Sequence, residues 1–269
     1  MALLEIAVLP KSTYYYHLKQ MKKPDKYKDI KEAIQTIYHK HKGRYGHRRI
    51  HKELKDLGYK LDPKTVLKLM NACNIKCQVR IRKYKSYKGS VGTIASNILE
   101  RDFKAEIPNQ KWVTDVTEFS MFGTKLFFSP ILDLFNAEVI SYNISDRPTF
   151  NQTLDMLDKA FMKIPKDTKL ILHSDQGWQY RMKRYHDRLK EKGVIQSMSR
   201  KGNCYDNAVI ENFFGLLKSE LFYLQKFDSM DHFHKELVSY IEYYNNDRIK
   251  LKLRGLSPVE YRKQFLKVA

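Results

Sequence analysis

Three acidic residues in the second part of the chain are of the type that holds metal ions: Asp115, Asp175 and Glu211, the last two separated by 35 intervening residues. Mg²⁺ prefers oxygen ligands, and one or two carboxylates per ion leave positions for water and a substrate phosphate. Two such ions, about 3.5–4 Å apart, can stabilise both the attacking and the leaving oxygen of a phosphoryl transfer. This chemistry requires that separate elements of the fold bring the three carboxylates together.

Each acid also has a simpler interpretation when it is taken alone. Asp115 could make a turn at a strand end, and Asp175 could turn the chain before Gln176 and Gly177. Glu211 falls in the first turns of an expected helix, where an acid interacts favourably with the helix dipole. Taken together, the expected elements let Asp115 and Asp175 approach one edge of a sheet and place Glu211 over them.

The elements around these acids are predicted from hydrophobic periodicity and turn residues. Strands are expected at 112–121, 125–134 and 137–145, as an antiparallel meander, and then at 169–174 and 194–198. Helices are expected at 149–162, from about 179 to 192, and from about 206 onward. This order predicts an α/β fold: a ribonuclease-H-like mixed five-stranded sheet with flanking helices over residues 96–269, with a helical C-terminal tail.

Positive charge is concentrated in the first part of the chain. The formal net charge is +20; residues 1–99 hold 23 Lys and Arg against 7 Asp and Glu, and the remainder holds 27 against 23. Simple solubility is one explanation. A charge so unevenly distributed favours a polyanionic partner, because each neutralised phosphate releases counterions and adds affinity. Nucleic acid is therefore the expected partner before any motif is considered, and the motifs that follow make double-stranded DNA the expected form.

The basic segment is predicted to be a small all-α, helix-turn-helix-like unit within residues 1–95. Helices are expected at 25–42 and 47–57, and a third is capped by Asp62 with Pro63 in its first turn. An ordinary helical hairpin is the alternative. Residues 75–90 form a basic, tyrosine-containing linker, and we expect the domain boundary near 95–105. The expected DNA-contacting residues are Arg44, Arg48, Arg49, Lys52, Lys64 and Lys68.

Other residues near the acids have two interpretations each. His173 could orient a water or a phosphate, or it could be a satisfied core residue. Trp178 and Tyr180 could stack on a base or fill the core. Gly177 is expected to permit a turn whose φ is unfavourable for other residues. Arg200 and Lys201 lie in a basic, glycine-containing loop that is expected to order on DNA.

Seven stretches resemble one protein family and occur in its order. They are YGHRRI (45–50), PKTV (63–66), WVTDVT (112–117), LHSDQGWQY (172–180), DNAVIENFF (206–214), YNNDR (244–248) and LSP (256–258). They resemble the OrfB-type transposases of the IS-three family of bacterial insertion sequences, which share a DDE catalytic core with retroviral integrases. The resemblance covers nearly the whole chain.

The resemblance implies a DNA transposase that cleaves a strand and then joins its 3′-hydroxyl to another phosphodiester. Asp115, Asp175 and Glu211 would hold two Mg²⁺ (or Mn²⁺) ions. Lys218, seven positions after Glu211, would contact the phosphate next to the scissile bond, and Lys250 stands where some relatives carry His. The family also implies a homo-oligomer on DNA and association or fusion with an upstream-frame OrfA product, without which this chain is expected to be inactive or weakly specific. A non-catalytic regulator of transposition and a nuclease without joining activity remain alternatives.

Several other classes of protein are not expected. His47, His51, Cys73 and Cys77 occur in the order of an integrase zinc domain, but the three residues between the cysteines and the helical position of His51 argue against zinc. The chain has three cysteines in total, and Cys204 is expected to be incidental. So few cysteines form no disulfide framework, which favours a reducing, cytoplasmic location. Within the bacterial cytoplasm we expect association with the nucleoid. The most apolar stretch, 126–135, is too short to span a membrane and contains Asp133.

Overall fold

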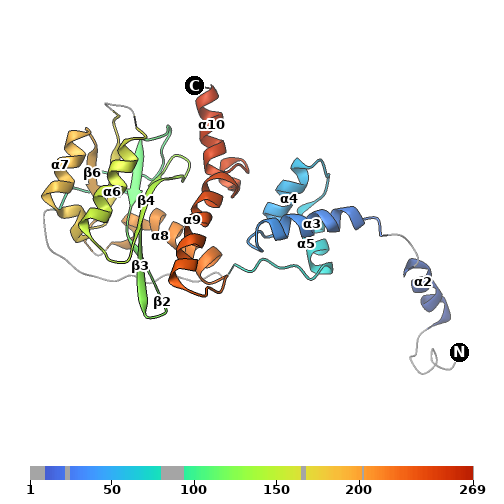
Figure 1. The fold of residues 1–269 in the computed structure, drawn as a ribbon. Helices are drawn as coiled ribbons and strands as arrows, with labels where there is room; N and C mark the ends of the chain where they lie inside the picture. Colours follow the sequence, from blue (N-terminus) through green and yellow to red (C-terminus); the bar gives the residue numbers. More distant parts are fainter. Residues whose placement is uncertain (1–9, 22–24, 80–93, 165–167, 202, 269) are drawn as a thin grey trace. The chain divides into compact units, whose positions relative to one another are not determined.

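The structure, a computed structural model, describes residues 10–21, 25–79, 94–164, 168–201 and 203–268 (Figure 1). The chain divides into two compact units, residues 1–78 and 79–269. Most of the predicted linker falls within residues 80–93, which lie outside the described residues. The predicted boundary near 95–105 therefore stays a prediction, and each unit is described by itself.

The first unit is helical in its described part. It contains α2 (Lys11–Met21), α3 (Lys28–Lys40), α4 (His47–Asp56) and α5 (Pro63–Ala72). The Asp62 side chain accepts a hydrogen bond from the Lys64 backbone N–H at 2.7 Å, which caps α5 as predicted. Helices α3, α4 and α5 pack on one another through the buried apolar residues Ile34, Ile37, Tyr45, Ile50, Leu54, Val66, Leu69 and Met70.

The second unit is built on a mixed sheet. Its strands are β1 (Lys111–Thr114), β2 (Thr117–Met121), β3 (Thr124–Asp133), β4 (Val139–Ser145), β5 (Ile171–Ser174) and β6 (Ile195–Met198). The long strand β3 pairs antiparallel with β4, and also antiparallel with both β1 and β2. On the other side, β1 pairs parallel with β5, and β5 parallel with β6. The single strand predicted at 112–121 is thus two strands, interrupted at Asp115 and Val116.

Helices cover both faces of this sheet (Figure 1). Because side chains alternate between faces along a strand, Trp112 packs on one face against α6 (Phe150–Phe161) and α7 (Lys183–Glu191). Its neighbour Val113 packs on the opposite face, in the cluster formed with α8 (Ala208–Leu217) and α9 (Met230–Asn246). The same alternation occurs at Ile131 and Leu132, and at Ile140 and Val139. Two hydrophobic layers therefore hold the sheet rigidly between helices.

Short non-α segments flank the helices that carry the predicted site. Helix α7 is preceded by the 3₁₀ turn η1 (Trp178–Arg181), and α8 by the 3₁₀ turn η2 (Cys204–Asn207). Helix α8 continues directly into a π-helical turn, η3 (Lys218–Phe222), in which the Tyr223 N–H donates to the Lys218 carbonyl at 2.8 Å. The long helix predicted from residue 206 is therefore a composite of three helix types. After α9 come η4 (Leu251–Leu253) and α10 (Pro258–Val268).

A buried ion pair joins η3 to the end of α9. The Arg248 guanidinium donates to both carboxylate oxygens of Glu220, at 2.7 and 2.6 Å, and the Tyr240 hydroxyl donates to the same carboxylate at 3.0 Å. Glu220 is 1% exposed and Arg248 2% exposed. The pair is a tertiary contact that fixes the π-helical turn against the C-terminal helices.

Candidate active site

Asp115 and Asp175 directly follow two neighbouring parallel strands. Thr114 at the end of β1 lies opposite Ser174 at the end of β5. The carboxyl ends of parallel strands lie at the same edge of a sheet, which is where ligands bind in open α/β folds. The next residue of each strand is an aspartate, so the sheet register places Asp115 and Asp175 next to each other.

Glu211 and Lys218 come from α8 and its continuation. Glu211 lies in the first turn of α8 and Lys218 directly follows the last residue of that helix. Seven residues in an α-helix make about two turns, so the two side chains share a face, as the sequence predicted. Both are partly buried. The Lys218 ammonium also lies over the Phe119 ring, 5.6 Å from its centroid.

The charges of these residues act on one another. Burial raises the pKa of Asp115 well above its usual range, and repulsion from Asp175 and Glu211 raises it further, whereas Lys218 opposes the rise. Burial also raises the pKa of Asp175 and of Glu211, and for Glu211 the charge of Asp175 adds to the effect. Burial lowers the pKa of Lys218, against the attraction of Glu118 and Asp115. The three carboxylates therefore lie within electrostatic range of one another and of one ammonium group.

Two residues immediately before α8, Asp206 and Asn207, had no predicted role. Asn207 donates from Nδ2 to Oδ2 of Asp115 at 3.2 Å, and Asp206 is a buried carboxylate with arginine partners. The sequence carries a signal for both, since an acid and an amide stand adjacent to each other shortly before Glu211. A carboxylate and an amide are the side chains from which hydrogen-bonded networks around catalytic acids are built.

The other residues predicted near the acids take different places. His173 is fully buried on β5, its Nδ1 lies 2.8 Å from the Ser197 hydroxyl, and burial lowers its pKa to about 4. These contacts favour the core interpretation. Arg200 is held by Asp206, and Lys201 is exposed.

Gly177 has an ordinary φ of −56°, so the prediction of an unusual turn is wrong. Instead, a Cβ at Gly177 would lie 2.8 Å from Oδ1 of Asp175, so the glycine leaves room for that carboxylate.

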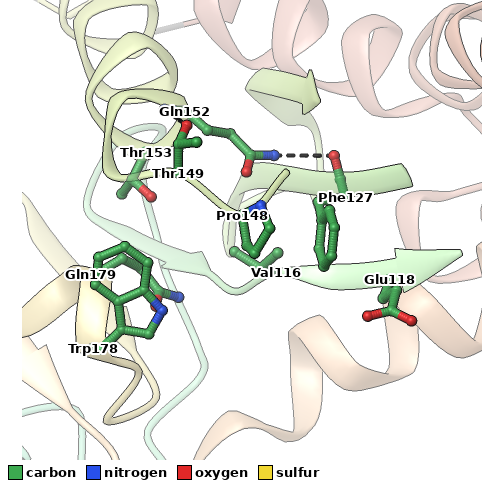
Figure 2. Close-up of a pocket in the computed structure, with 9 residues that line it drawn as sticks. All are labelled: Val116, Glu118, Phe127, Pro148, Thr149, Gln152, Thr153, Trp178 and Gln179. Carbon is green, nitrogen blue, oxygen red and sulfur yellow. Dashed lines mark hydrogen bonds between the residues drawn. The ribbon is translucent and has the colours of Figure 1, made fainter. Parts of the chain in front are cut away.

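A pocket of about 270 Å³ is lined in part by residues that follow the two aspartates in the sequence (Figure 2). Its walls include Val116, which follows Asp115, and Trp178 and Gln179, which follow the Asp175–Gly177 turn. Trp178 is 50% exposed, whereas Tyr180 is fully buried among apolar residues. Of the two aromatic residues considered for base stacking, the structure therefore leaves only Trp178 accessible. The remaining lining residues are Glu118, Phe127, Pro148, Thr149, Gln152 and Thr153.

The sequence matches known families along most of its length. Residues 105–204 and 211–266 match two families that are both described as Integrase core domain, and residues 25–84 match one described as HTH-like domain. The putative transposase InsK for insertion sequence element IS150 of Escherichia coli is 55% identical over 262 residues, which cover 97% of this chain and 93% of that protein. The transposase for insertion sequence element IS904 of Lactococcus lactis is 35% identical over 236 residues, covering 87% and 93%. The chain belongs to the IS-three family of insertion-sequence transposases.

The transposase is thus a DNA-acting enzyme of the DDE polynucleotidyl transferase class, with an OrfB-type arrangement of domains. The transposase InsF for insertion sequence IS3A of Escherichia coli is 34% identical over 237 residues, covering 87% of this chain and 82% of that protein. Among solved structures, the HTLV-2 integrase catalytic core domain in complex with magnesium is 17% identical and covers 59% of this chain and 99% of that chain, at a TM-score of 0.46.

The first unit of the transposase presents most of its predicted DNA-contacting residues at the surface. Arg48, Lys64 and Lys68 are exposed, and Arg49 and Lys52 partly so, with Lys52 paired to Asp56 at 2.6 Å. Arg44 differs, because it is buried with 4% of its surface exposed. A side chain this buried has little surface with which to contact DNA, so Arg44 is not among the proposed DNA contacts.

The residues of the rejected zinc site make ordinary contacts within the transposase. The His51 Nε2 lies 2.9 Å from the Leu61 carbonyl oxygen, and the Cys77 thiol donates to the Arg44 carbonyl at 3.4 Å. None of the helices in the described part of the chain is long and apolar enough to cross a membrane.

Proposed function

We propose that Asp115, Asp175 and Glu211 are the catalytic and metal-binding residues with which the transposase cleaves DNA and transfers the resulting 3′-hydroxyl. The observation that supports this most directly is the parallel register of β1 and β5, which ends in adjacent aspartates. The mutual repulsion of the three carboxylates supports it further. Structural carboxylates are normally paired with a cation, and like charges gathered at the end of a sheet favour binding of one.

The chemistry of these side chains fits divalent metal. A DDE integrase core implies a divalent ion, and carboxylate oxygens are the ligands that Mg²⁺ and Mn²⁺ share. Within the described ranges, no three His, Cys, Asp or Glu side chains lie close enough to form a metal site as they stand. Glu211, in the first turn of α8, would therefore complete the set when metal and DNA are present. We propose two ions, which Asp115, Asp175 and Glu211 would hold.

The two chemical steps use the same protein groups. Bound metal ions would supply Lewis acidity at the attacking and leaving oxygens. In the first step water attacks the phosphodiester at the element end and the 3′-oxygen leaves. In the second, that 3′-hydroxyl attacks a target phosphodiester, and the bond to the 3′-oxygen of the target strand breaks. The half-buried Lys218 ammonium, within range of Asp115, would hold the phosphate next to the scissile bond. No covalent protein intermediate or nucleotide cofactor is needed.

DNA outside the active site would be held by the remaining basic residues. We propose phosphate contacts for Arg48, Arg49, Lys52, Lys64 and Lys68 in the first unit, all at least partly exposed. In the second unit Lys201 is exposed, whereas Arg200 would have to share its guanidinium with Asp206. We further propose that the transposase acts as a homo-oligomer on DNA, near the bacterial nucleoid, and that it associates or is fused with an OrfA product.

The test uses labelled DNA carrying the terminal repeats of the element. Wild-type protein, as the natural OrfA fusion if needed, should cleave and join the repeat ends in Mg²⁺, and Asp175→Asn should lose both reactions by at least about 1,000-fold. Asp187→Asn is the matched control, because Asp187 is an exposed acid on α7, and it should retain activity. Mg²⁺-dependent cleavage by Asp175→Asn would contradict the assignment. If the wild type cleaves but does not join the DNA, the result would support the nuclease alternative. If it neither cleaves nor joins, the result would support the non-catalytic regulator alternative.

A further inference from the structure

The carboxylate of Asp115 is held in one orientation by two hydrogen bonds. Its Oδ1 accepts from the Val116 backbone N–H at 2.7 Å, and its Oδ2 accepts from the Asn207 side-chain amide at 3.2 Å. The first bond comes from the strand break itself. The second comes from a residue far away in the sequence, at the end of η2, and it joins the start of α8 to the end of β1. Asn207 therefore couples the helix that carries Glu211 to the strand that carries Asp115.

The other end of the Asn207 side chain has no partner. Asn207 is 4% exposed, and its Oδ1 is buried without a hydrogen bond to any described residue. A buried acceptor left unsatisfied is destabilising, because it has lost its hydrogen bonds to water and gained none in the protein. Rotating the amide by 180° would not relieve this in the ionised form of Asp115 that binds metal, because Oδ1 would then face a carboxylate that has no proton to donate. The free carbonyl oxygen is thus a consequence of the contact with Asp115.

A clamp around the preceding residue keeps Asn207 in place. Asp206 is fully buried, and its carboxylate accepts from Arg101 Nε at 2.8 Å, from Asn97 Nδ2 at 3.0 Å, and from Arg200. Arg200 contributes three donors, Nε at 2.9 Å, Nη2 at 3.0 Å and its backbone N–H at 3.0 Å. These bonds hold the pKa of Asp206 far below its usual range. The clamp ties η2 to residues 97–101 and prevents Asn207 from moving away to satisfy its oxygen.

We propose that Asn207 is a positioning residue of the metal site, an inference that rests on the proposed role of Asp115. Its amide N–H group orients the Asp115 carboxylate for metal, and its buried carbonyl oxygen accepts a hydrogen bond from water in that site. A polar group that is buried and unsatisfied, beside carboxylates that bind hydrated ions, has the surroundings that an ordered water requires. Partners that orient metal ligands in this way typically change metal affinity by about 10–100-fold when they are removed.

The experiment measures metal binding directly, without DNA. Titration calorimetry with Mn²⁺ on the full-length protein should give an apparent Kd that is about 10–100-fold higher for Asn207→Leu than for wild type. Asn207→Leu has the same branched arrangement of heavy atoms but neither donor nor acceptor, and its melting temperature without metal should be equal or higher, because the unsatisfied oxygen is gone. Asn207→Ser, which retains a hydroxyl donor, should recover part of the affinity. Asn246→Ala removes an exposed amide of α9 and should bind Mn²⁺ like wild type.

The outcomes separate this inference from the proposed function. If wild type binds Mn²⁺, Asp175→Asn does not, and Asn207→Leu binds as wild type does, then Asn207 is not a positioning residue while the acidic site stands. If Asp175→Asn binds as tightly as wild type, the acidic site itself is misassigned. If Asn207→Leu does not fold, Asn207→Ser decides: unchanged affinity and an unchanged Mg²⁺ dependence of cleavage would overturn the proposal.

Discussion

Replacing Arg248 by methionine should destabilise the second unit by about 3–5 kcal/mol, because the buried Glu220 carboxylate loses the guanidinium that faces it. Glu220 is 1% exposed, and the substitution removes the two hydrogen bonds from Arg248, at 2.7 and 2.6 Å, while the bond from the Tyr240 hydroxyl remains. For a unit that spans residues 79–269, each kcal/mol shifts the melting temperature by about 2–4 °C. The expected decrease is therefore roughly 6–20 °C, measured by calorimetry and by urea unfolding.

Two further variants distinguish an ion pair from a simple loss of packing. Adding Glu220→Gln to Arg248→Met removes the unpaired charge and keeps an acceptor for Tyr240, so the double variant should regain most of the lost stability. Arg188→Met breaks ion pairs that are 43% exposed on the arginine side and should cost less than about 1 kcal/mol.

The destabilisation by Arg248→Met should also depend on pH. An unpaired buried carboxylate has a raised pKa, so it binds a proton in the folded state as the pH falls, and the loss of stability should be smaller at pH 5 than at pH 8. A destabilisation below about 1 kcal/mol, equal at both pH values and unchanged in the double variant, would refute the reasoning.

Three other predictions concern the acidic site. Asp115→Asn removes a repelled buried charge, so without metal it should unfold at a higher urea concentration than wild type at pH 7, although it is inactive; lower stability would contradict the electrostatic account. In metal-free wild type, Asp115 and Asp175 have raised pKa values, so the folded state keeps protons that the unfolded chain has released. Stability should then fall as the pH rises from about 4 through the raised values, and Mn²⁺ affinity should rise over the same range; a flat profile in both would exclude raised pKa values. Lys218→Ala should reduce the salt-dependence slope of DNA binding by about 0.9, whereas Lys226→Ala, an exposed lysine outside the site, serves as control; equal slopes would remove Lys218 from the DNA-contacting set.

Much of this fold follows from local sequence patterns. The strands at 124–133 and 139–145 and the helix at 150–161 lie within one or two residues of their predicted bounds, because alternation and amphipathic spacing record which face of an element is buried. The capped start of α5 was also predictable, since Asp62 and Pro63 act on the residues next to them. The positions of Asp175 and Glu211 relative to their elements were predictable, because Asp175 follows a strand with a clear pattern and Glu211 lies in the first turns of a helix.

What the sequence could not predict depends on contacts between distant residues. The break at Asp115 occurs within an otherwise continuous strand pattern, and the π-helical turn after Lys218 is fixed by Glu220 and Arg248, which pair across the fold. Burial of Arg44 has the same origin, since a basic residue in a turn gives no local sign of being inside. The contact between Asn207 and Asp115 likewise joins residues that only the assembled sheet and helix bring together.

The paired register of β1 and β5 has a consequence for how this gene can change. Because side chains alternate between faces, a shift of one residue moves every side chain of a strand to the opposite face. A single-codon deletion within Lys111–Thr114 would therefore turn Asp115 away from Asp175, even though Asp115, Asp175 and Glu211, the proposed catalytic residues, were all still encoded. Length changes in this strand should be far more damaging than substitutions. The active site is thus specified as much by the spacing of codons in β1 as by the codon for the aspartate itself.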